Sequence, residues 1–105
     1  MILTTTNSIE WSPITAYKGL VSSEVIIWAN VVKDFFAGLT DIFWGRSSIY
    51  EATIWEAKQE ALKELEQQAT HLGANAIVGI DFDFEVIGAG GSMLMVSVSG
   101  TAVTL

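Results

Sequence analysis

The sequence predicts an α+β fold in which an antiparallel sheet is covered by one long and one short helix. Three observations carry this prediction: residues 14–29 alternate in polarity, a central stretch is rich in strong helix formers, and the C-terminal third alternates again. The chain has 105 residues, the usual size of one domain, which leaves no room for a second core. We therefore expect residues 1–105 to form a single domain.

Two strands are predicted before the first helix. Residues 2–5 suit a short edge strand, and a turn containing the only proline follows. In residues 14–29, one face carries Tyr17, Val21, Val25 and Ile27, and the other carries Lys18, Ser22 and Glu24. Ile26 and Trp28 make the end of this segment apolar on both faces. Such a strand is expected to be central in a layered fold or to be covered by another subunit.

Two helices are predicted in the middle of the chain. Asn30 can cap a short amphipathic helix that ends near Trp44-Gly45, because apolar residues recur in it at spacings of three and four. Ser48-Ile49-Tyr50-Glu51 has the pattern of a capping box. The helix that it begins runs to Leu72, where Gly73 ends it. This second helix is long enough to span one face of the sheet.

The last third of the chain predicts a β-hairpin made by residues 76–87 and 92–105. Alternation places one set of apolar residues on a single face of the first strand: Val78, Ile80, Phe82, Phe84 and Val86. Facing residues of a hairpin should share polarity, which pairs Phe84 with Val96 and Phe82 with Val98. That register requires a loop of odd length. The glycine-rich Ala89-Gly90-Gly91 would supply a three-residue loop, and five residues would keep the same phase.

Composition excludes several classes of function. The net charge of −7, from five basic and twelve acidic residues, argues against nucleic acid binding because no basic patch can displace counterions. The absence of cysteine removes disulfides, thiolate nucleophiles and cysteine-based metal sites, and a reducing cytoplasm fits it. Half of the residues are hydrophobic and only 16% are charged, so some apolar surface should be covered by self-assembly.

Export and membrane insertion are not expected either. The N-terminal residues lack the basic and long apolar regions of a signal peptide. Residues 86–105 carry no charge, but their glycine, serine and threonine content and their period of two are typical of a strand. We therefore expect a cytoplasmic protein that does not bind membranes.

One candidate metal site lies in the predicted hairpin. Asp81, Asp83 and Glu85 fall on one face of a strand, where their oxygens could collect a divalent cation. A solvated sheet face explains the same stripe. The lone histidine, His71, lies in the last turn of the long helix, where it would interact with the helix dipole. No residues are predicted to be catalytic.

A second candidate site combines Arg46 and Trp28. Arg46 stands close to the predicted start of the long helix, where it could clamp an anion held by free N–H groups or pair with a carboxylate across a subunit boundary. Trp28 is one of four tryptophans, which are many for this length, and such side chains anchor cores and interfaces alike. We place both residues at an anion site or a subunit interface.

Motifs along the whole chain resemble those of the YbjQ-like bacterial proteins. They are Thr4-Thr5-Thr6-Asn7-Ser8-Ile9-Glu10, Val32-Lys33-Asp34-Phe35-Phe36, Asp41-Ile42-Phe43, Gly45-Arg46-Ser47, Tyr50-Glu51, Leu72-Gly73-Ala74-Asn75-Ala76-Ile77-Val78-Gly79 and Gly100-Thr101-Ala102-Val103. The resemblance implies a dodecin-like β-α-β-β fold, a ring-shaped homopentamer and the heavy-metal label that this uncharacterised family carries. Two functions stay open: an oligomeric module that binds a metal ion or another small ligand at subunit boundaries, and a small enzyme whose carboxylates meet only in the assembled ring.

Overall fold

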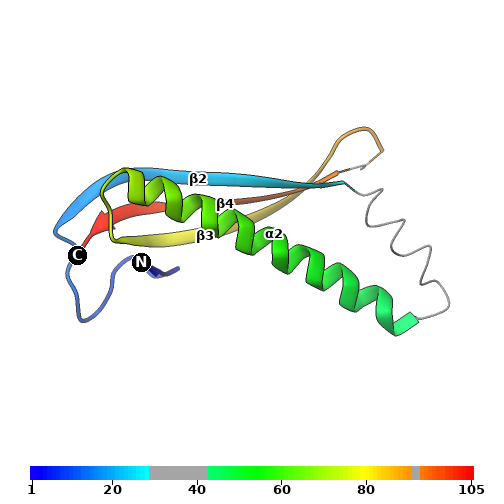
Figure 1. Cartoon of the computed structure of the whole chain (residues 1–105), viewed down its shortest axis with the longest axis horizontal. Coiled ribbons are helices and arrows are strands. Elements are labelled where there is room, and N and C mark those ends of the chain that lie inside the picture. The colour runs from blue at the N-terminus through cyan, green and yellow to red at the C-terminus, as the bar shows by residue number, and fades with distance from the viewer. Residues whose placement is uncertain (29–42, 91–92) are drawn as a thin grey trace.

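The computed structural model describes residues 1–28, 43–90 and 93–105, with the side chains of residues 43–50 left out. Its elements are β1 (Ile2–Leu3), β2 (Ala16–Trp28), α2 (Phe43–His71), β3 (Ala76–Ile87) and β4 (Met93–Thr104). Helix α2 crosses one face of the sheet and diverges from the strands toward its N-terminal end (Figure 1). The predicted short helix lies almost wholly outside the described residues.

The four strands form one sheet in the order β1-β3-β4-β2. Strand β4 pairs antiparallel with both β2 and β3, whereas β1 pairs parallel with β3. The predicted α+β fold is confirmed, and the sheet is antiparallel through β3, β4 and β2, whereas the parallel pairing of β1 departs from the prediction. Strands β2 and β3 run in the same direction with β4 between them, because α2 returns the chain to the end of the sheet from which β2 started.

The hairpin register follows the prediction. Phe84 lies opposite Val96 and Phe82 lies opposite Val98. The last pair is Ile87 with Met93, so the connection spans residues 88–92, which is the odd five-residue alternative. Gly88 and Gly90 have φ angles of 82° and 67°, in the left-handed region where glycine carries no steric penalty.

Two β-bulges move residues to the opposite face from the one that simple alternation predicts. The register shifts between Val78 and Asp81, where Gly79 has a φ angle of 63°. This extra residue separates Val78 from Ile80, which were predicted on one face. A second shift between Tyr17 and Gly19 separates Tyr17 from Val21 in the same way. Both predicted pairs are wrong, since an alternating pattern cannot show where one strand inserts a residue.

The main core lies between α2 and the sheet. Every fourth residue of the helix from Ala57 to Ala69 is buried, and three of these four residues are alanine, so the helix approaches the strands closely. The cluster that they join consists of Val21, Ala61, Leu65, Ala69, Ile77, Ile80, Val98 and Ala102. Buried Ser23 donates a hydrogen bond of 2.6 Å to the carbonyl oxygen of Ala61.

A smaller core lies on the opposite face, at the end of the sheet near the termini. Ile9, from the segment that follows β1, covers Ala76, Val78 and Val103 there. The distal end of the sheet, where β2 ends and the hairpin turns, has no such cover among the described residues. The radius of gyration of 16.9 Å exceeds the roughly 13 Å expected for a compact domain of this length.

The start of α2 differs from the prediction. The helix begins at Phe43 and passes through Gly45, Arg46 and Ser48 without a break. The predicted helix end at Trp44-Gly45 and the predicted capping box at Ser48 are therefore wrong. A single glycine inside a helix costs about 1 kcal/mol relative to alanine, which neighbouring helix formers outweigh. Its other end is as predicted, because Gly73 adopts a φ angle of 80° just after His71.

No helix in the described residues is long and apolar enough to cross a membrane.

Candidate functional site

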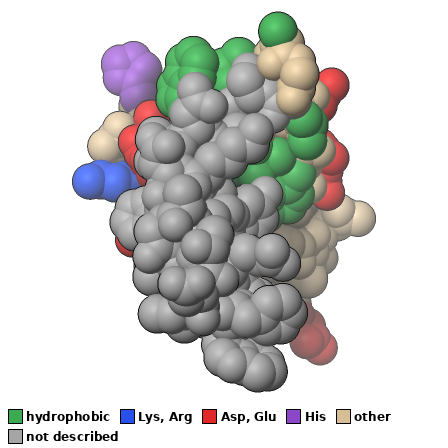
Figure 2. All heavy atoms as spheres, turned by 90° about the vertical axis from the view of Figure 1, so that its right-hand side faces the viewer, with side chains coloured by type: hydrophobic (Ala, Val, Ile, Leu, Met, Phe, Trp, Pro, Cys, Tyr) green, Lys and Arg blue, Asp and Glu red, His purple; other side chains and the backbone are tan. Residues whose placement is uncertain are grey.

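The predicted carboxylates lie on the sheet face that α2 leaves uncovered, which we call the far face. Asp81, Asp83 and Glu85 are all exposed there. The register adds a carboxylate that the sequence analysis did not include, because Glu24 of β2 and Asp83 of β3 both lie opposite Ser97 of β4. Figure 2 shows one group of acidic side chains at the right edge of the molecule, beside apolar ones, and further acidic side chains at the left. The far face is thus acidic toward its middle.

The spacing of these carboxylates limits what one protomer can bind. Neighbouring positions on one face of a strand lie about 6.7 Å apart, and Glu24 and Asp83 are separated by two strand spacings, about 9.6 Å. A hard cation such as Ca²⁺ requires several oxygens at about 2.3–2.6 Å. In the described part of the chain, no three His, Cys, Asp or Glu residues are placed to hold a metal ion. The stripe therefore offers separate carboxylates and no coordination cage.

The donor types do not fit a heavy metal either. Soft metal ions prefer thiolate, thioether and imidazole ligands, whereas carboxylates prefer hard cations. The sequence contains no cysteine and a single histidine, His71. That histidine lies in the last turn of α2, on the helix side of the sheet, away from the carboxylates of the far face. The residues of a single protomer thus do not fit the heavy-metal site that the family label implies.

Trp28 and Arg46, the other predicted site residues, lie on different elements. Trp28 is the last residue of β2, lies on the far face, and has 56% of its surface exposed. Arg46 lies in the first turn of α2, and its side chain is outside the described residues. The predicted corner between two helices at residues 44–48 is replaced by continuous helix.

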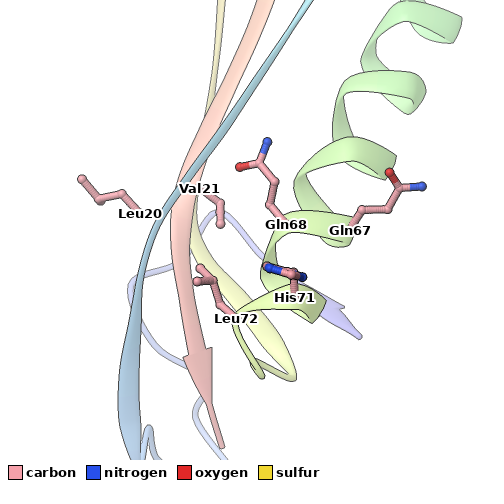
Figure 3. Close-up of a pocket in the computed structure, with 6 residues that line it drawn as sticks. All are labelled: Leu20, Val21, Gln67, Gln68, His71 and Leu72. Atoms are coloured by element: carbon pink, nitrogen blue, oxygen red, sulfur yellow. The ribbon is translucent and has the colours of Figure 1, made fainter.

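A first groove lies between the C-terminal end of α2 and the outer edge of β2. It has a volume of about 460 Å³ and is lined by Leu20, Val21, Gln67, Gln68, His71 and Leu72. Figure 3 shows the Gln68 side chain reaching from the helix toward β2, while Leu20 points away on the opposite side of the strand. Gln68 holds the strand there through two hydrogen bonds to Ser22.

A second groove continues along the same gap toward the distal end. It has a volume of about 270 Å³ and is lined by Val25, Ile26, Ile27, Trp28, Thr53, Glu56, Ala57 and Glu60. Two carboxylates on the helix therefore face an apolar strand edge. Sequence periodicity could not reveal either groove, because both depend on which side of α2 lies along β2.

On the other side of α2, a lysine contacts two aromatic rings. The ammonium of Lys58 lies 5.8 Å from the ring centre of Phe82 and 5.4 Å from that of Phe84. Both distances are within the range of a cation–π interaction. Lys58 thereby covers part of the aromatic surface of β3 beyond the main core.

Comparisons with known proteins identify the family of this chain and a solved structure with a similar fold. The model of a family described as "Putative heavy-metal-binding" matches residues 1–105. A UPF0145 protein of Acetivibrio thermocellus is 52% identical over 105 residues, which cover 100% of this chain and 99% of that protein. A crystal structure of a protein of unknown function from Pediococcus pentosaceus, of the DUF74 family, is similar with a TM-score of 0.58 and 22% identity, over 100% of this chain and 97% of that one. The structural likeness shows a shared fold.

Proposed function

Because this chain belongs to the YbjQ family, whose description is "Putative heavy-metal-binding", we propose that it is a self-assembling binding module that holds its ligand where copies meet. The proposed assembly is a homopentamer, and the proposed ligand is a divalent cation or another small molecule. The described part of one protomer leaves apolar side chains exposed and offers too few carboxylate oxygens to coordinate a cation. Neighbouring copies would cover the apolar side chains and supply further oxygens.

The observation that carries this proposal is the apolar surface at the distal end of the sheet, which we call the apolar end. Its exposed side chains are Ile26, Trp28, Phe84 and Val86. Ile26 and Trp28 lie on the far face, whereas Phe84 and Val86 lie on the helix side. Burying a large apolar side chain stabilises by about 1.5–3 kcal/mol, so covering both faces would strongly favour assembly.

The carboxylates of the far face support the binding part of the proposal. Asp81, Asp83 and Glu85 are too far apart to share one ion within a protomer, and a neighbouring copy would bring a second set of oxygens. The oxygen donors favour a hard divalent cation over a soft heavy metal. The proposed site is therefore weak and intermolecular.

Multi-angle light scattering tests the assembly directly. The proposal requires a mass several times the 11.4 kDa of one chain at micromolar concentration. Replacing Trp28→Ser together with Val86→Ser removes apolar surface from both faces and should lower that mass. Trp11→Ser is the matched control, because Trp11 is equally a large exposed residue but lies in the segment between β1 and β2. A wild-type protein that stayed monomeric would overturn the proposal.

A further inference from the structure

The outer edge of β2 already shows how it would accept a partner strand. The N–H of Ser22 donates to Gln68 Oε1 at 3.2 Å, and Gln68 Nε2 donates to the carbonyl oxygen of Ser22 at 2.6 Å. An antiparallel neighbour makes the same pair of bonds to one residue of an edge strand. The Gln68 amide therefore takes the place of a strand at this single position.

The next outward-facing backbone groups have no such partner among the residues that the structure describes. Because backbone groups alternate in direction along a strand, those of Glu24, Ile26 and Trp28 point to the same side as those of Ser22. Within the described part of the chain, none of these three makes a hydrogen bond on that side. Unpaired groups on a long edge strand are a template for another strand.

The groove beside this edge defines the chemistry of the partner. Glu56 and Glu60 lie one helical turn apart on α2 and face β2 across the smaller groove. Among the described residues neither forms an ion pair. An added strand would place alternate side chains toward these carboxylates, and the intervening ones on the far face beside Ile26 and Trp28.

We propose that the edge of β2 from Glu24 to Trp28 binds an extended segment of another protein in which basic and apolar residues alternate. The backbone groups of Glu24, Ile26 and Trp28 supply the hydrogen bonds, as in other cases of β-strand addition. Glu56 and Glu60 select the basic side chains. The site ends at Gln68, because its side chain already forms hydrogen bonds with the outward N–H and carbonyl oxygen of Ser22.

A second copy of this chain does not fit the site. Its five basic residues are Lys18, Lys33, Arg46, Lys58 and Lys63, and no two of them are two positions apart. The free edge of β3 carries apolar side chains on one face and the carboxylates Asp81, Asp83 and Glu85 on the other, so neither face offers a cation to the acidic groove. The inference thus goes beyond self-assembly, because the occupant is a different chain.

Fluorescence anisotropy with a labelled synthetic peptide tests the proposal. A short peptide of alternating lysine and valine should bind saturably, and added salt should weaken the binding. The same peptide with every amide nitrogen methylated keeps its charge but has no N–H donor on either edge, so it should not bind. Equal binding of both peptides would show that charge attraction alone causes the binding, which would overturn the proposal. Absence of binding by both peptides would also overturn it. Light scattering on the same samples reports self-assembly separately.

Variants of the edge locate the binding. Ile26→Pro removes an outward N–H without removing a bond to β4, and it should abolish peptide binding, whereas Ile26→Thr keeps the N–H and should retain binding. Glu56→Gln with Glu60→Gln should weaken binding by about two- to tenfold at low salt. Glu10→Gln with Glu64→Gln removes the same charge from exposed positions outside the groove and should leave affinity unchanged. Equal losses in the two double variants would overturn the proposal.

Hydrogen exchange provides a readout that does not depend on the folding of any variant. In the wild-type protein, the peptide should slow exchange of the outward amides of Glu24, Ile26 and Trp28. The amides of Val25 and Ile27 point toward β4 and should change little. Protection at the outward amides of β3, those of Phe82 and Phe84, without protection at β2, would place the peptide elsewhere and contradict the inference.

Discussion

The hydroxyl of Ser23 in β2 donates a hydrogen bond of 2.6 Å to the carbonyl oxygen of Ala61 in α2. A strand side chain thereby contacts the helix backbone directly, which is possible because Ala61 is fully buried and carries only a methyl group. The pair sets the distance between helix and sheet. Both grooves along β2 depend on this distance, since they lie between the same two elements.

Ser23→Ala should lower the free energy of unfolding by about 1 kcal/mol. The loss is modest because the carbonyl of Ala61 keeps its place in the helical hydrogen-bond ladder. Urea denaturation followed by circular dichroism measures the change. Ser22→Ala is the control, since only the backbone of Ser22 contacts Gln68, and it should be nearly neutral. Equal effects at the two positions would contradict this role for the hydroxyl of Ser23.

Gly79 should tolerate asparagine better than alanine. Its φ angle of 63° lies in the left-handed region, which costs an ordinary L-residue about 1–2 kcal/mol and asparagine less. Space does not decide the outcome, because an added Cβ would meet only Asn7 Oδ1, at 3.8 Å. Thermal denaturation of Gly79→Ala and Gly79→Asn checks the order. If alanine were the better replacement, backbone conformation would not be what requires glycine in this bulge.

The elements that the sequence predicts well are those that a local pattern determines. Alternation from Ala76 to Ile87 gives the bounds of β3, and shared polarity across the hairpin gives its register with β4. The C-terminal end of α2 follows from Gly73, because glycine readily adopts the left-handed conformation there.

The features that the sequence does not predict depend on single inserted residues or on distant pairing. The bulge at Gly79 sends Val78 to a different core from Ile80, and alternation alone predicts the reverse. Glu24 joins the acidic far face only through the pairing of β2 with β4, which no local pattern specifies. The acidic groove likewise depends on which side of α2 lies along β2. Alternation therefore predicts that the carboxylates of β3 share one face, but it cannot predict that Glu56 and Glu60 face β2.

Lys58→Ala should destabilise the protein by about 0.5–1 kcal/mol, because it removes a cation from the faces of Phe82 and Phe84. Lys58→Arg should retain most of the stability, since a guanidinium also stacks on aromatic rings. Lys63→Ala, on an exposed position of the same helix, is the matched control. Urea denaturation of the three variants at low and high salt measures these differences in stability. If Lys63→Ala were as destabilising as Lys58→Ala, the contact with the aromatic rings would not be the cause.

Metal binding should be weak and should depend on the carboxylates of β3. One protomer presents Asp81 and Asp83 about 6.7 Å apart, so a cation held where copies meet gains only a few oxygens and keeps much of its hydration. Isothermal titration calorimetry should therefore give a dissociation constant on the order of a millimolar for Ca²⁺ or Mn²⁺. Asp81→Asn with Asp83→Asn should remove the signal, and Glu56→Gln with Glu60→Gln, which removes the same charge elsewhere, should leave it. Tight zinc or copper binding that survived the aspartate changes would mean that other residues supply the ligands, and the far face would then have no part in a metal site.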